Sequence, residues 1–159
     1  MPTGQVGFTL VPMASSPAPT PIDPRGPRFN QAVVSVLLLI AFVVEQPLVV
    51  PAMAVVLLAG AALGPRWGPF LLLYSRLVRP RLPAPAELED PRPPRFAAAV
   101  GVIVLSAATV AFLAGYGVVG WVLTLVVAVL AGLAATTGIC VGCEIWLFAA
   151  RRRGVRLVA

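Results

Sequence analysis

The chain has 159 residues, of which 59% are hydrophobic and 11% are charged, and its formal net charge is +6. Soluble domains contain roughly 25% charged residues, so this composition predicts a protein of the lipid bilayer. The sequence has no His, and its basic residues are all Arg, which excludes His-ligated haem, a His general base and a Schiff-base lysine. Without these residues we expect no cofactor and no metal. We also expect no nucleic-acid partner, because the arginines flank apolar segments, where they face anionic lipid headgroups.

In chain order, a proline-rich tail expected to be disordered comes first, over 1–22. Two uncharged segments follow, separated by Glu45-Gln46-Pro47, and each can roughly cross the bilayer as a helix. Near the middle, an amphipathic interfacial helix and a Pro-rich cytoplasmic linker are predicted. The 48 uncharged residues from Phe96 to Cys143 are too many for one crossing and must turn back, at Gly115-Tyr116-Gly117. The predicted crossings are 29–44, 47–64, 96–114 and 118–138; the interfacial helices are 69–79 and 140–153, with the linker at 80–89 and a tail at 155–159.

An internal repeat organises these elements. The eleven residues that begin at Asp23 return at Asp90 with eight identities, and each copy leads into an apolar segment. Leu58-Ala59-Gly60 is echoed at Leu130-Ala131-Gly132, which aligns Tyr74 with Trp146. We therefore predict an all-α integral membrane fold with four transmembrane helices. They form two parallel-repeat hairpins, 23–79 and 90–154, each ending in its interfacial helix.

The arginines give this topology an orientation. They precede the first crossing, lie between the second and third, or follow the fourth, so all fall on one side. The positive-inside rule makes that side cytoplasmic, with both termini inside. The arginines are Arg25, Arg28, Arg66, Arg76, Arg79, Arg81, Arg92, Arg95, Arg151, Arg152, Arg153 and Arg156.

Each repeat opens with Asp-Pro-Arg. Asp23 and Asp90 stand where a carboxylate can cap the first turn of the helix that follows. The neighbouring arginines have two interpretations. They can anchor the helices to lipid headgroups, or they can form an anion-attracting vestibule if the copies meet across the pseudo-axis. The arginines of this candidate vestibule are Arg25, Arg28, Arg92 and Arg95.

Cys140-Val141-Gly142-Cys143 is the one candidate for chemistry. A helix break at Thr136-Thr137-Gly138 would place Cys140 in the first turn of a new helix, where the dipole lowers the pKa of a thiol. Cys140 is then the attacking thiol, Cys143 the resolving thiol and Glu144 the proton acceptor. Two alternatives stay open: inert cysteines packed in an apolar helix, and a metal shared by a homodimer.

The doubled Asp-Pro-Arg-x-Pro-Arg-Phe and the terminal Cys-x-Gly-Cys together resemble the bacterial integral-membrane family known as domain of unknown function 4395, over roughly 22–154. The resemblance implies a multi-pass protein of the bacterial inner membrane without an assigned reaction. The sequence favours thiol-based redox or sulfur handling with a thioredoxin- or rhodanese-like cytosolic partner. The alternatives are a transporter of a sulfur-containing anion and a structural membrane subunit.

Overall fold

The computed structural model describes residues 22–63, 68–83, 85 and 88–152. The remaining residues include 1–21 of the predicted tail 1–22, the predicted tail 155–159, the last residue of the second predicted crossing and three positions of the linker. Arg66, Arg153 and Arg156 also lie outside the described residues.

Every regular element among the described residues is helical, which confirms the all-α prediction. Four of the helices are long: α1 (Arg25–Val43), α2 (Val49–Leu63), α4 (Arg92–Leu113) and α5 (Gly117–Thr137). Two helices are shorter, α3 (Pro69–Leu73) and α6 (Val141–Arg152). Helix α3 continues directly as a π-helical turn, η1 (Tyr74–Val78), which is followed by a 3-10 turn, η2 (Arg79–Arg81).

Three of these helices, α1, α4 and α5, are long and apolar enough to cross a membrane, with 19, 22 and 21 residues. Length and composition thus make the chain a membrane protein. Helix α2 is equally apolar but has 15 residues. At ~1.5 Å per residue it is about 22 Å long, less than the ~30 Å of a typical hydrocarbon layer. The fourth crossing and the repeat topology therefore stay predictions.

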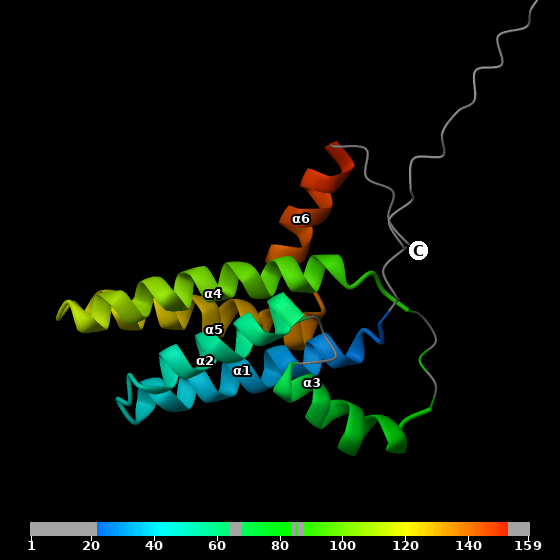
Figure 1. Ribbon diagram of the computed structural model, residues 1–159, viewed down its shortest axis with the longest axis horizontal. Coiled ribbons are helices and arrows are strands. Elements are labelled where there is room, and N and C mark those ends of the chain that lie inside the picture. The colour runs from blue at the N-terminus through cyan, green and yellow to red at the C-terminus, as the bar shows by residue number, and fades with distance from the viewer. Residues whose placement is uncertain (1–21, 64–67, 84, 86–87, 153–159) are drawn as a thin grey trace, which may run out of the picture.

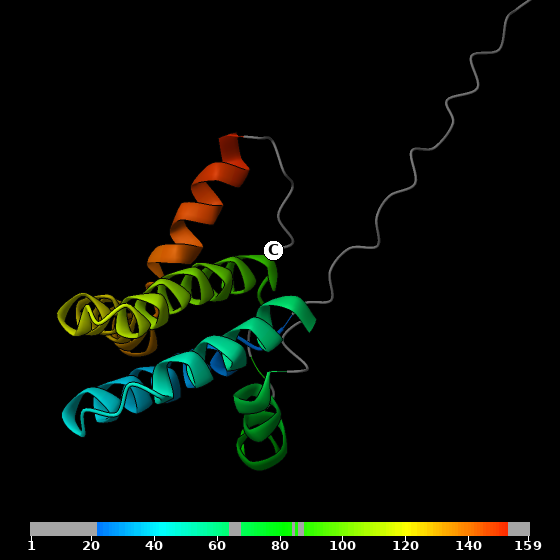
Figure 2. The same cartoon turned by 60° about the vertical axis from the view of Figure 1, so that its left-hand side comes forward.

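The long helices lie side by side in one bundle (Figure 1). Helix α1 packs on α5, α2 on α4, and α4 on α5. The α1–α2 and α4–α5 turns lie together at one end. At the other end α3 and α6 leave the bundle in opposite directions, as Figures 1 and 2 both show. The described arginines belong to this second end, because they begin α1 and α4 or lie in α3–η2 and at the end of α6. We call it the basic end.

The bundle buries apolar side chains between its helices and also exposes apolar side chains on its outer faces. Leu38 of α1 and Leu105 of α4 are both fully buried, and they stand at equivalent positions of the sequence repeat. Between α1 and α5, the Ser35 hydroxyl donates a 2.8 Å hydrogen bond to the Ala128 carbonyl. Many large apolar side chains on the outer faces are exposed, among them Ile103 and Val129. Exposed apolar surface of this extent is expected of helices surrounded by lipid.

An aromatic cluster joins the two hairpins at the end opposite the arginines. The Trp121 ring meets Phe42 edge-on, with centroids 5.4 Å apart, and Phe112 with centroids 4.9 Å apart. Phe42 lies in the last turn of α1, whereas Phe112 and Trp121 flank the α4–α5 turn. This turn is predicted at Gly115-Tyr116-Gly117, and Gly115 adopts a φ of 83°, which glycine tolerates without strain.

At the basic end, the segments that lead into α1 and α4 pair with each other. Ile22 and Glu89 exchange two backbone hydrogen bonds of 2.9 Å. Directly after them, Asp23 accepts the Arg25 N–H, and Asp90 accepts the Arg92 N–H, each at 2.9 Å. Each carboxylate therefore serves the first residue of its helix in the same way, near the positive end of the helix dipole.

Candidate functional site

The site begins where α5 ends. Thr137 is the last residue of α5, and Gly138 follows with a φ of 76° in the left-handed region, a common way to end a helix. The Thr137 hydroxyl oxygen then accepts the Ile139 N–H at 3.1 Å. Because the chain breaks here and restarts as α6 at Val141, Cys140 is the residue that immediately precedes a helix.

Cys140 occupies the capping position of α6. Its Sγ accepts the backbone N–H of Cys143 at 3.3 Å, the bond that a Ser or Asp oxygen makes at a helix N-cap. Its Sγ also accepts the Gln31 side-chain amide at 3.6 Å, within range for sulfur. Gln31 belongs to α1, so residues of both halves of the chain hold this sulfur.

These donors favour the thiolate form of Cys140. The pKa of its thiol falls from 9.0 to about 6, chiefly because the Cys143 thiol hydrogen-bonds to it. Burial opposes the shift, while the backbone N–H of Cys143 and the Gln31 amide add to it. A lower pKa means that the proton leaves at lower pH, so the thiolate of Cys140 is more populated at neutral pH than that of an ordinary cysteine.

Cys143 has the opposite tendency. Its pKa is raised because its thiol donates to Cys140, and burial and the negative charges of Cys140, Glu89 and Glu144 act in the same direction. Glu144 is exposed on the first turn of α6, and its backbone N–H donates to the Cys140 carbonyl. The electrostatics of the pair therefore favour the proton on Cys143 and the thiolate on Cys140.

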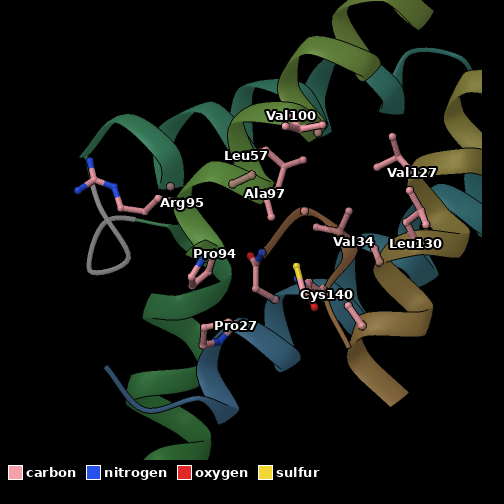
Figure 3. A pocket seen from close by; sticks show the side chains of 18 of the residues that line it. Pro27, Val34, Leu57, Pro94, Arg95, Ala97, Val100, Val127, Leu130 and Cys140 are labelled. Carbon is pink, nitrogen blue, oxygen red and sulfur yellow. The ribbon is translucent and has the colours of Figure 1, made fainter. Parts of the chain in front are cut away.

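A cavity of about 170 Å³ lies beside Cys140. Its walls come from α1, α2, α4 and α5 over the half of the bundle nearest the basic end, and they are largely aliphatic. Figure 3 shows the yellow sulfur of Cys140 pointing into it, with Val34, Leu130 and Ala97 around it. Asn30 and Gln31 supply carboxamides to the lining. The thiolate therefore faces an apolar chamber.

The model of a domain of unknown function (DUF4395) matches residues 22–151. This range contains both copies of the repeat, Gln31 and the thiol pair. The chain belongs to the DUF4395 family. No curated protein and no solved structure matches it.

In this DUF4395 protein the candidate vestibule arginines each contact backbone or a carboxylate. Arg95 donates to the carbonyls of Ala61 and Ala62 at the end of α2, at 3.0 to 3.2 Å. Arg28 lies over Gly138 at the end of α5, where an added Cβ would meet its Nη2 at 2.7 Å. Arg25 donates to the Pro83 carbonyl, and the Arg92 Nε lies 3.9 Å from Asp90. An anion-binding role for them stays a prediction.

Sequence reasoning missed Asn30 and Gln31, although a signal for them was present. The two repeat copies differ at three of eleven positions, and two of these replace Asn30 and Gln31 by Ala97 and Ala98. Both carboxamides and Cys140 line the same cavity, together with the two alanines. Divergence between the copies thus marks the polar side of the cavity in this DUF4395 chain.

Proposed function

We propose that this membrane protein carries out thiol-based redox or sulfur chemistry through Cys140 and Cys143. The observation that carries the proposal is the placement of the Cys140 sulfur, which caps α6, accepts two N–H groups and faces a cavity. A sulfur that only filled space would need none of these donors. Cys140 is the attacking thiolate, Cys143 the resolving thiol and Glu144 the proton acceptor.

The partner in this proposal is a thioredoxin- or rhodanese-like protein on the cytosolic side. The Cys140 thiolate attacks a partner sulfur in a disulfide or persulfide. A new S–S bond then forms while the old one breaks, and the departing sulfur leaves as a thiolate that takes a proton. Cys143 next attacks Cys140 in the mixed disulfide, giving its proton to Glu144, and the partner departs as the leaving thiolate.

The location in this proposal is the inner membrane of a bacterium, with both termini and the basic end in the cytoplasm. The chain would consist of two parallel hairpin repeats, each with two crossings. Three observations support the repeat: the Ile22–Glu89 pairing, the matching bonds of Asp23 and Asp90, and the packing of α1 on α5 and of α2 on α4. The positive-inside rule supports the orientation.

Trapping in cells tests the proposed chemistry. In a Cys143→Ala variant the resolving thiol is missing, so a partner or a transferred sulfur stays on Cys140. Mass spectrometry of the purified protein should find a reductant-sensitive adduct at Cys140, a thioredoxin-fold protein or a persulfide. The matched Cys140→Ala variant should carry none at Cys143. If neither variant carries an adduct, and a double alanine variant restores a deletion strain fully, the cysteines are inert and the proposal is wrong.

A further inference from the structure

The cavity beside Cys140 restricts what can bind there. Its volume of about 170 Å³ is close to that of a cavity of about 150 Å³ that holds benzene in an engineered protein. A six-membered ring therefore fits. The walls are mostly aliphatic, and the guanidinium of Arg95, which also lines the cavity, already donates to the Ala61 and Ala62 carbonyls. A charged ligand would lose its hydration with little compensation, so we infer an uncharged ligand.

The cavity also reaches the outer surface of the bundle. Val100 of α4 and Val126 and Leu130 of α5 line it, and the same three side chains are 39%, 47% and 42% exposed. They lie within helices that are long and apolar enough to cross a membrane. A ligand can consequently enter from the hydrocarbon layer as well as from the basic end.

The polar groups of the cavity define the reactive end of the ligand. The Cys140 sulfur and the carboxamides of Asn30 and Gln31 are part of a largely aliphatic lining, and the Gln31 amide donates to the sulfur. Carboxamide N–H groups can donate to a carbonyl oxygen. A thiolate next to a thiol is a two-electron reductant, because forming one S–S bond releases two electrons.

We propose that this cavity binds the ring of a lipid-soluble quinone, which takes electrons from the Cys140–Cys143 pair. The quinone combines a flat ring, carbonyl acceptors, lack of charge and two-electron capacity. The Cys140 thiolate and the Cys143 thiol lose two electrons and form one S–S bond. The quinone gains these electrons together with the Cys143 proton and one proton from water, and leaves as quinol. The inference rests on the proposed function, with the exchange running in the opposite direction: a reduced partner dithiol attacks the Cys140–Cys143 disulfide, leaves as a disulfide and restores the two thiols, and the quinone accepts the electrons that the partner supplies.

The test compares two oxidants on purified, reduced, full-length protein in lipid nanodiscs. Ubiquinone-1 requires the cavity, whereas diamide oxidises accessible thiols without a binding site. Maleimide mass tagging measures the loss of free thiols over time. With wild type, the ubiquinone-1 rate should saturate with concentration. Ala131→Phe fills the cavity from α5 and should slow the reaction with ubiquinone-1 about tenfold, equivalent to ~1.4 kcal/mol of binding, while diamide oxidation keeps its rate.

Val129→Phe is the matched control, since Val129 is two residues away on α5, 63% exposed and outside the cavity lining. It should behave as wild type. If Ala131→Phe also loses its reaction with diamide, Val104→Phe on α4 replaces it as the cavity-filling variant, with exposed Ile103→Phe as its control. Two outcomes overturn the inference and leave the proposed function standing. In the first, wild-type thiols react with diamide but show no saturable reaction with ubiquinone-1. In the second, the cavity-filling variants react with ubiquinone-1 as fast as wild type. Thiols inert to both oxidants overturn both.

Discussion

At the scale of single residues, the two similar segments of the sequence contribute different side chains to the cavity. The position that aligns with Cys140 in the first half is Gly68, and the positions that align with Asn30 and Gln31 in the second half are Ala97 and Ala98. All of these residues line the same cavity. The reactive sulfur and its carboxamide neighbours thus come from different halves, and their counterparts are small and apolar.

Gln31 should tune the nucleophile. The iodoacetamide reaction of Cys140 should rise with pH through about 6 and level off above it, because the thiolate is the reacting form and the pKa is lowered from 9.0. Gln31→Ala removes one donor to the sulfur, so the profile should move several tenths of a pH unit upward. Mass spectrometry at each pH assigns the label to Cys140.

Asn30→Ala is the control for that shift, because Asn30 also lines the cavity and lies next to Gln31 on α1. Its profile should match wild type. A Gln31→Ala profile that coincides with wild type, or a wild-type midpoint near 9, would contradict the role assigned to the amide and to the capping position.

The helix break before Cys140 could be predicted from the sequence, but the surroundings of its sulfur could not. The Thr137-Gly138 break is a local signal, since it depends on a cap and on one glycine with positive φ. The Gln31 contact joins residues 109 positions apart. It depends on how α1 packs on α5, which apolar periodicity alone does not specify, because helices apolar on every face can pack in several orientations.

At the scale of elements, the first helix of each half holds the end of the second helix of the other half. Arg95 of α4 donates to the last turn of α2, and Arg28 of α1 covers the end of α5. Cationic groups there compensate the negative end of the helix dipole, and Arg95 also satisfies carbonyls that lack helical partners. This role explains the two arginines by helix stabilisation, which the sequence motif alone did not reveal.

Replacing Arg95 by Leu should therefore destabilise the bundle. The α2 carbonyls lose a charged donor, which corresponds to about 1 kcal/mol. Thermal unfolding in detergent, followed by tryptophan fluorescence, should show a lower midpoint. Arg76→Leu is the comparison, because Arg76 is exposed on η1, and its midpoint should stay at the wild-type value. Equal midpoints for both variants would refute the capping role.

Helix boundaries were more predictable than helix type. The segment expected as an interfacial helix over 69–79 is α-helical only to Leu73, then widens to η1 and tightens to η2, ending at Arg81. Pro80 follows Arg79 and has no backbone N–H to donate, which limits regular α-helix at this point. Tyr74, buried at the change of helix type, donates to Asp23 at 3.3 Å.

At the scale of the whole molecule, the two halves are similar in their first helices and differ in their second. Leu38 and Leu105 are buried alike, as are Ala41 and Ala108. In contrast, Leu57 is buried, whereas Val129, its counterpart in the Leu-Ala-Gly alignment, is 63% exposed. The similarity of the first helices could be predicted, because the Asp-Pro-Arg-x-Pro-Arg-Phe motif leads into both α1 and α4. The difference between the second helices depends on which face α2 and α5 each turn toward their different neighbours.

Positive charge is distributed unevenly between the two ends of the bundle. The described arginines gather at the end that holds the thiol pair, and Glu45 occupies the α1–α2 turn at the opposite end. Arginines favour the cytoplasmic side of a membrane, so we expect Cys140 to lie where cytosolic partners can reach it.

Side-specific labelling of Cys140 tests this expectation most directly. A membrane-impermeant maleimide is applied to inverted inner-membrane vesicles and, separately, to spheroplasts, and the modified residue is located by mass spectrometry. We predict rapid modification at Cys140, before Cys143, in inverted vesicles, and none in spheroplasts until the membrane is opened. Modification of Cys140 in intact spheroplasts, or none in either preparation, would contradict a reactive thiol at the cytoplasmic face.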